Sequence, residues 1–237
     1  MSLCVRLLIS ISLFCLLAAC AGPGTKIDIA PAALAQVKTI AVIRSPEPKT
    51  YRIYYDNWRT STALDFLFLP FVVPDLRTKA DIVSKALKAH GASVMSDLAN
   101  NLSAQLIQLG FASRVDDGQW EETDGKFTLP ANKIQSDADA VLVVSASFVG
   151  FAALQFSDYH PTIRAEVTLL AKDRTVTLYR GFHWSGAGPA SDPWKRSSAN
   201  VTFANFDAVM ADIPVSAKSL SDATYGIATT VAADLKR

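Results

Sequence analysis

Ser185 lies in a short run of small and aromatic residues that partly matches a catalytic motif. The run, HWSGAG at positions 183–188, is similar to the nucleophile elbow G-x-S-x-G, in which a tight strand-to-helix turn exposes a reactive serine. That turn requires glycine two positions before the serine, and the chain has His183 there. The pattern therefore favours a strand that ends in a glycine-rich turn, with a serine hydrolase as the alternative from another functional class.

Other residues that carry acid–base or metal chemistry are scattered along the chain. The histidines, His90, His160 and His183, are not spaced as metal ligands, and the sequence has no H-E-x-x-H, C-x-x-C or Walker motif. Asp137 and Asp139 would share one face of a strand and form a paired-carboxylate site, although two aspartates at the start of a strand more often solvate a turn. The sequence therefore predicts no catalytic residue and no metal ligand.

The most apolar segment beyond the first 20 residues is Leu64–Leu76, which includes Phe68 and Phe71. A helix that spans a bilayer needs about 20 apolar residues. This segment is shorter, and Pro70 and Pro74 interrupt it. A core strand or a buried loop is the first interpretation. The alternative is an exposed surface on which Phe68 and Phe71 contact a membrane or a partner protein.

Two further groups combine aromatic and basic residues. The first group contains Tyr51, Tyr54, Tyr55, Trp58 and Arg59. The second contains Trp194, Lys195 and Arg196, which lie within the proline-containing segment Pro189–Ser197. A strand and a solvated loop are the simpler interpretations of the two groups. Because Trp and Arg dominate the energetics of protein interfaces, Trp58, Trp194 and Arg196 are candidate contact residues.

The hydrophobic patterns predict the elements that would position these residues. Strands are expected at Val37–Arg44, Tyr51–Tyr55, Phe111–Val115, Ala140–Ser145, Ile163–Ala171 and Thr175–Trp184, helices at Lys79–Gly110 and at the carboxy terminus, and a loop at Gly186–Asn200. The order predicts a single α/β (α+β) domain with a mixed, mostly antiparallel sheet covered by helices.

Three local signals refine this prediction. The first helix is expected to break near Gly91 and to start again with Ser93 as its cap. Asp116-Asp117-Gly118 is expected to form a turn, and Asp173-Arg174 to join two strands as a hairpin. The apolar residues at helical spacing, expected to face the sheet, are Val94, Leu98, Leu102, Leu106 and Leu109 in one helix and Leu220, Ile227, Val231 and Leu235 in the other.

The first 19 residues are predicted to be a lipoprotein signal peptide. Arg6 precedes the apolar run Leu7–Ala19, and the chain then continues with Cys20 between small residues. This arrangement resembles the lipobox, which implies cleavage between Ala19 and Cys20 and lipid attached to the Cys20 thiol. An ordinary secretory signal with an incidental cysteine is the alternative.

The remaining cysteines and the net charge limit the other possibilities. Cys4 and Cys15 lie within the predicted signal peptide, so the mature chain would hold Cys20 alone and could form no internal disulfide. Without Arg6, the 23 basic and 22 acidic residues become 22 of each, which gives a formal charge of zero. The charge favours no nucleic-acid partner. No cofactor is expected besides the covalent lipid on Cys20.

The predicted organisation after cleavage has two parts. Residues 20–36 would form the lipidated cysteine and a short linker with Gly22, Pro23, Gly24 and Pro31, and residues 37–237 a single domain. In the lipoprotein pattern an aspartate after the cysteine retains the protein at the inner membrane. The chain has Ala21 there, which implies the outer membrane and a domain that faces the periplasm.

The region Val37–Trp184 resembles a group of envelope lipoproteins: the penicillin-binding-protein activators, the curli-secretion lipoprotein and the amino-terminal domain of the Tol translocation protein. The resemblance rests on an opening strand, a helix that ends in Leu109-Gly110-Phe111, and the strand ADAVLVV at 138–144 followed by a hairpin. It implies an outer-membrane-anchored, non-catalytic binding or assembly factor with an envelope protein as partner. The alternatives are an auxiliary lipoprotein of an envelope transport or export system and a periplasmic serine hydrolase.

Overall fold

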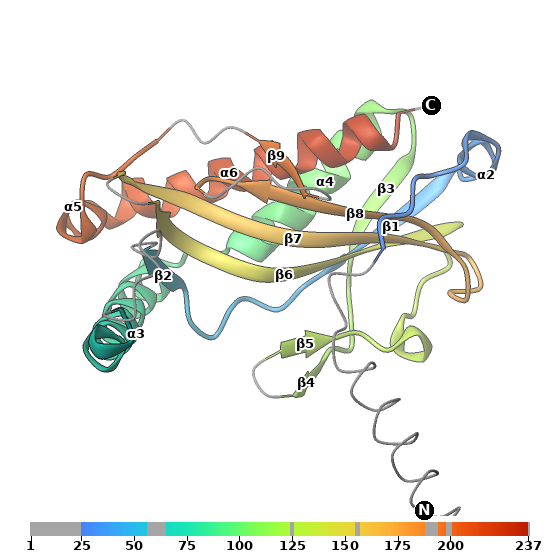
Figure 1. Cartoon of the computed structure of the whole chain (residues 1–237). Coiled ribbons are helices and arrows are strands. Elements are labelled where there is room, and N and C mark those ends of the chain that lie inside the picture. The colour runs from blue at the N-terminus through green and yellow to red at the C-terminus, as the bar shows by residue number, and fades with distance from the viewer. Residues whose placement is uncertain are drawn as a thin grey trace, which may run out of the picture.

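A mixed sheet of seven strands, flanked by helices, forms the centre of the molecule (Figure 1). The structure is a computed structural model that describes residues 25–55, 65–123, 126–154, 157–187, 194–197 and 201–236, with the backbone alone for 65–73 and 126. The sheet strands are β1 (Thr39–Arg44), β2 (Arg52–Tyr55), β3 (Ala112–Asp117), β6 (Ala140–Ala153), β7 (Tyr159–Ala171), β8 (Thr177–Ser185) and β9 (Trp194–Ser197). The helices are α2 (Pro31–Ala35), α3 (Asp65–Ala89), α4 (Val94–Gln108), α5 (Phe206–Ala211) and α6 (Ile213–Asp234), with a 3-10 turn at Ala131–Lys133.

The strands lie in the order β3-β1-β6-β7-β8-β9, and β2 pairs with the carboxy-terminal part of β6. β1 pairs in parallel with β3 and β6, and β8 pairs in parallel with β9. The antiparallel pairings of β7 with β6 and with β8 are the longest. The predicted α/β fold, with a mixed sheet covered by helices in a single domain, is confirmed.

The hairpin of β7 and β8 follows the alternating pattern in the sequence. Ile163 and Ala165 are fully buried toward the helices, whereas Arg164, on the other face, is only partly buried. The predicted turn places Arg174 at φ 63°, and its guanidinium donates a hydrogen bond to the Ser136 carbonyl (2.8 Å). The alternation therefore determines which face of the sheet the helices cover.

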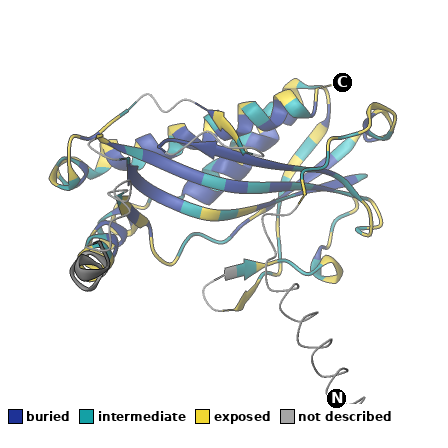
Figure 2. Ribbon diagram, in the orientation of Figure 1, coloured by how far each residue is buried: buried dark blue, intermediate teal, exposed yellow. Residues whose placement is uncertain are grey.

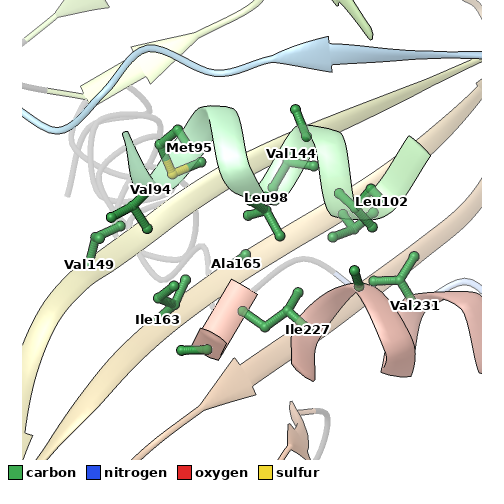
Figure 3. Close-up of a cluster of buried hydrophobic side chains, with 14 of the residues drawn as sticks. Val94, Met95, Leu98, Leu102, Val144, Val149, Ile163, Ala165, Ile227 and Val231 are labelled. Carbon is green, nitrogen blue, oxygen red and sulfur yellow. The ribbon is translucent and has the colours of Figure 1, made fainter. Parts of the chain in front are cut away.

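The main hydrophobic core lies between the sheet and the pair α4 and α6, which pack together along one face of the sheet (Figure 1). Figure 3 shows side chains of both helices meeting those of β6 and β7. All but one of the residues predicted to face the sheet are buried: Val94, Leu98, Leu102, Leu106, Leu220, Ile227, Val231 and Leu235. The exception is Leu109 at the end of α4, which is partly buried. The helical spacing in the sequence identified this core correctly.

The start of α4 is capped differently from the prediction. Ser93 occupies the cap position, but its side chain makes no capping hydrogen bond. Instead, the Glu47 carboxylate accepts hydrogen bonds from the backbone N–H groups of Met95 and Ser96 (2.9 and 3.1 Å). A distant acidic residue thus satisfies the free N–H groups of the first helical turn, where negative charge is favoured.

The predicted helix at Lys79–Gly110 is divided at Gly91, which has a φ of 82°. Its first half, α3, begins much earlier than predicted, at Asp65. The backbone of Leu64–Leu76 is therefore helical from its second residue, and the interpretation as a core strand or a buried loop was wrong. Pro70 and Pro74 lie inside the helix, and the Thr78 hydroxyl donates to the Pro74 carbonyl (3.0 Å).

A second, smaller core covers one end of the opposite face. Ala41, Ile43 and Val141 are buried there with Ile134, and Trp120 packs against them. The short hairpin of β4 (Glu121–Thr123) and β5 (Lys126–Thr128) lies on this side of the sheet (Figure 1). Farther along β6, exposed residues interrupt the buried strand (Figure 2). We call the part of this face that carries Arg52, Phe148, Arg164, Trp184 and Arg196 the open face.

The predicted linker over residues 20–36 is shorter than expected. Ile27 forms two backbone hydrogen bonds with Arg180 of β8 (3.0 and 2.9 Å), and Leu34 in α2 is 1% exposed within the main core. Because these contacts hold the segment against the sheet, the described part of the linker belongs to the domain.

Two other predicted boundaries were wrong. Asp116 and Asp117 end β3 rather than forming a turn, since β3 pairs with β1 up to Asp117. The predicted loop Gly186–Asn200 contains β9, whose pairing with the distant β8 was not visible in its local sequence.

Candidate functional site

A pocket of about 480 Å³ lies where β2 joins β6, next to α3 and β7. Its strand residues Arg52, Phe148 and Arg164 belong to the open face, because their neighbours in sequence point into the main core. The lining residues are Arg52, Ile53, Tyr54, Leu76, Arg77, Ala80, Phe148, Ala152, Thr162 and Arg164. The pocket thus combines an apolar wall with arginines from three elements, and none of its described lining residues is acidic.

Gly150 positions one of these arginines. Its φ is +156°, and a Cβ atom at this position would lie 1.9 Å from the backbone oxygen of Arg52. Only glycine therefore allows β2 to approach β6 closely enough to pair. This pairing places Arg52 in register with Thr162 of β7, on the same face as Arg164 and two residues away from it along β7.

The arginines of the pocket differ from the described arginines that lie outside the open face. Elsewhere, each guanidinium outside the open face has an acceptor: Arg44 and Arg114 are paired with aspartates, Arg174 with backbone carbonyls, and Arg180 with Glu166. Among the described residues, the guanidinium groups of Arg52, Arg77 and Arg164 have no hydrogen-bond or ion-pair partner. Their donors remain free to bind a ligand.

Trp184 holds the guanidinium of Arg164 in place. The Arg164 guanidinium carbon lies 4.9 Å from the centre of the Trp184 ring, and that of Arg196 lies 5.6 Å from it. Trp184 is 2% exposed, so the two cations shield the indole from water. Nε of Arg164 is buried without an acceptor in the described structure, which leaves an unsatisfied donor beside the pocket.

Two predicted contact residues extend this face. Trp194 and Arg196 were expected in a solvated loop, but they lie in β9, opposite Phe182 and Trp184 of β8. The rings of Trp194 and Phe182 are 5.4 Å apart, and Arg196 is exposed. The structure therefore places Arg196 on the same Trp184 ring as Arg164, and Trp194 beside Phe182 on the same face.

A separate polar cluster is buried on the other face, beneath α6. The Tyr179 hydroxyl donates to Asp234 Oδ2 (2.9 Å) and lies 2.7 Å from His183 Nε2, and His183 Nδ1 lies 2.9 Å from the Thr230 hydroxyl. Lys195 forms an ion pair with Asp234. The Thr230 hydroxyl donates to the Ile227 carbonyl (2.9 Å), so it accepts from Nδ1, which carries the proton of the neutral imidazole. Nε2 and Asp234 then share the one hydrogen of the Tyr179 hydroxyl.

Burial controls the proton chemistry of this cluster. It lowers the pKa of His183 to about 4, because the charged imidazolium would lose its hydration; Asp234 opposes this shift and Lys195 adds to it. Burial also raises the pKa of Tyr179 well above its ordinary value, and Asp234 adds to that shift. Both groups are therefore neutral at pH 7, and the cluster joins α6 to β8 and β9.

The residues of the hydrolase hypothesis do not form a catalytic pair. Ser185 is 0% exposed, and its hydroxyl has no hydrogen-bond partner in the described structure. Both ring nitrogens of the nearby His183 are occupied by Tyr179 and Thr230. An activated serine requires a base within hydrogen-bond reach, and that contact is missing here.

The predicted carboxylate pair has structural contacts. Asp137 pairs with Arg114 on the surface, which lowers the pKa of Asp137. Asp139 accepts hydrogen bonds from the backbone N–H groups of Lys38 and Thr39 (3.1 and 3.0 Å), and these bonds lower its pKa. The two carboxylates therefore stabilise the start of β1 and the edge beside β3.

Two broader properties concern the described residues only. They contain no group of three or more His, Cys, Asp or Glu side chains placed to hold a metal ion. None of the helices in this part of the chain is both long and apolar enough to cross a membrane.

Several predicted site residues are not placed by the structure. Ala19, Cys20 and Trp58 lie outside the described residues, so cleavage, lipidation and a contact role for Trp58 stay predictions. For Phe68 and Phe71 the structure describes only the helical backbone of α3, and their exposure stays untested.

The arginines of the pocket could not be identified from the sequence alone. Arg52 and Arg164 alternate with buried residues along their strands, a pattern that also describes any solvent-facing side chain. The sequence offered no local motif that would bring them together with Arg77.

The sequence matches no protein-family model and no curated protein. Among solved structures, it is similar to a dodecamer of a PelC variant from Paraburkholderia phytofirmans, with 11% identity and a TM-score of 0.37 over 90% of this chain and 98% of that chain. It is also similar to a neuraminyllactose-binding hemagglutinin homolog from Helicobacter pylori, with 9% identity and a TM-score of 0.35 over 91% of this chain and 90% of that one. Neither is named as a member of the envelope-lipoprotein group that the sequence resembles, and that resemblance stays a prediction.

Proposed function

We propose that this chain is a lipid-anchored, non-catalytic binding protein of the bacterial envelope, held at the outer membrane and facing the periplasm. The observation that supports a binding role is the pocket on the open face, where three guanidinium groups have no acceptor among the described residues. Unpaired arginines beside buried aromatic rings are typical of sites that recognise a partner or ligand. The ligand or envelope partner would bind at this face.

The lipid anchor would keep the domain close to the membrane. Ile27 is bonded to β8, and only residues 21–26 separate it from Cys20. Seven residue-to-residue steps span at most about 25 Å when fully extended. An acylated Cys20 would therefore hold Ile27, and the part of β8 to which it is bonded, within about 25 Å of the lipid surface.

The anchor is tested by Cys20→Ala. We expect this variant to lack lipid and, if processed, to appear in the soluble periplasmic fraction, because the acyl chains supply the membrane attachment. Cell fractionation followed by a high-pH carbonate wash measures this. A variant that stays membrane-bound after the wash would refute lipidation at Cys20.

The binding face is tested by photocrosslinking in intact cells with a matched pair of tyrosines. Benzoylphenylalanine replaces either Tyr54, which lines the pocket and is 40% exposed, or Tyr225, which lies on α6 and is 56% exposed. We expect a specific adduct from position 54 and none from position 225, and mass spectrometry identifies the partner. Adducts from position 225 alone, or equally from both, would place the binding surface elsewhere.

A further inference from the structure

We propose that the pocket on the open face binds a phosphate group through Arg52, Arg77 and Arg164. This deepens the proposed function, because it names the chemistry that the binding face recognises. The phosphate proposal rests on the proposed function because both use the same pocket. It does not depend on the lipid anchor.

The charge of the pocket is the first support. Three positive side chains line it, and no Asp or Glu is among the lining residues that the structure describes. Positive charges around one cavity repel one another, and an anion between them offsets this repulsion because it attracts each of them. Since the other arginines outside the open face are paired, the unpaired set marks this place as different from the rest of the described surface.

The number and origin of the arginines favour phosphate over carboxylate. A carboxylate has two oxygens in one plane and is matched by a single guanidinium. Inorganic phosphate or a phosphate monoester presents three or four tetrahedral oxygens and carries more charge, so it accepts from guanidinium groups that approach from several sides. Here they come from β2, α3 and β7, three elements that surround the pocket.

The preorganisation of Arg164 is the second support. The Trp184 ring stacks on its guanidinium, and its Nε is buried without an acceptor in the described structure. An arginine held in this way loses less side-chain freedom when it binds an anion. Trp184 is thus a positioning residue and does not itself contact the ligand.

The apolar wall indicates that the phosphate is part of a larger organic molecule. Ile53, Leu76, Ala80, Phe148 and Ala152 line the same pocket. A phosphate ester would place its charged group at the arginines and its carbon skeleton against these side chains. The monoester headgroup of phosphatidic acid and a soluble phosphate monoester share this chemistry.

The test uses the chain from residue 20 onward with Cys20→Ala, so that no acyl chain attaches it to vesicles. Isothermal titration at about 0.15 M salt, where exposed charges are largely screened, measures binding of inorganic phosphate and glycerol 3-phosphate. We expect saturable binding of both, weakened about tenfold or more by Arg164→Gln and by Arg77→Gln, because each removes a charge-assisted hydrogen bond. Lys85→Gln, which removes an exposed charge from the same helix α3, is the matched control and should leave binding unchanged.

Cosedimentation with vesicles that contain phosphatidic acid identifies the source of the phosphate. Arginine-dependent binding to the vesicles indicates a lipid headgroup, and binding of glycerol 3-phosphate without vesicle binding indicates a soluble ester; both support the proposal. An equal loss in Lys85→Gln would show general charge attraction and overturn it. Citrate, a carboxylate anion, is titrated in the same way. If citrate binds through the arginines and inorganic phosphate does not, the phosphate assignment is overturned and the proposed binding function stays intact.

If inorganic phosphate, glycerol 3-phosphate and citrate all fail to bind and position 54 gives no crosslink, both proposals fail.

Discussion

Truncating Leu98 or Leu106 to alanine is expected to lower the free energy of unfolding by about 2–5 kcal/mol each. The two side chains are 0% and 1% exposed in α4, in the main core between the sheet and α6. Truncation leaves a cavity that neighbouring side chains fill only in part, so the loss exceeds that of transferring the deleted methyl groups to water. Chemical denaturation, followed by circular dichroism, measures the effect.

Ile107→Ala provides the matched control, because Ile107 lies on the same helix next to Leu106 and is 55% exposed. Its loss of stability should be within about 0.5 kcal/mol, as for most surface substitutions. If Leu98→Ala and Leu106→Ala unfold like Ile107→Ala, the assignment of the buried face of α4 is wrong.

The elements that the sequence predicted well have their cause in local patterns. Leu98 and Leu106 recur at helical spacing, and Ile163 and Ala165 alternate with partly buried residues. The local sequence pattern therefore predicts the buried face of each element. Gly91 also ended a helix as predicted, since its left-handed φ suits glycine.

The elements that were predicted poorly depend on contacts between distant residues. β9 exists because it pairs with β8, and its own four residues, with an aromatic, two basic and one polar side chain, resemble a loop. Glu47 caps α4 from a separate segment, which local capping rules cannot detect. The prolines of Leu64–Leu76 indicated an interrupted segment, whereas α3 continues through both of them.

The candidate site could not be predicted from the sequence, because it too depends on contacts between distant residues. Arg52, Arg77 and Arg164 come from two strands and a helix, and only the sheet topology makes them neighbours. The aromatic and basic residues of β9 stay predicted contact candidates, and the position of Arg196 beside Trp184 requires the parallel pairing with β8. Residue types therefore predicted a binding protein, and long-range packing determines where the candidate residues gather.

The second large effect concerns acid. We expect the free energy of unfolding to fall as the pH is lowered from about 6.5 to about 4, with His183 alone contributing about 3 kcal/mol. In the unfolded chain His183 binds a proton below about pH 6.5, whereas in the folded protein it does so only below about pH 4. Between these values the unfolded state binds more protons, so acid favours unfolding. Above pH 6.5 the imidazole is neutral in both states, and the full stability is present.

The structural reason is that the neutral ring is the form that fits beneath α6. His183 is 0% exposed, and its two nitrogens already have Tyr179 and Thr230 as partners. Gly181 makes room for this arrangement, since a Cβ there would lie 1.9 Å from the Tyr179 hydroxyl and 2.6 Å from His183 Nε2. A protonated ring would bring an additional charge into this site next to Lys195, and the Asp234 carboxylate only partly offsets it.

Denaturation curves at several pH values between 4 and 7 test this for His183→Gln against His90→Gln. His90 is exposed at the end of α3, so its variant should keep the full pH dependence. His183→Gln should be less stable at pH 7, because the hydrogen bonds of the cluster are disturbed, but its stability should change less toward pH 4. Burial also lowers the pKa of His160, which adds a loss of the same sign to both variants and cancels in their difference. If both variants lose the same stability between pH 6.5 and pH 4, then His183 is not the acid-sensitive group and the neutral cluster beneath α6 is wrongly assigned.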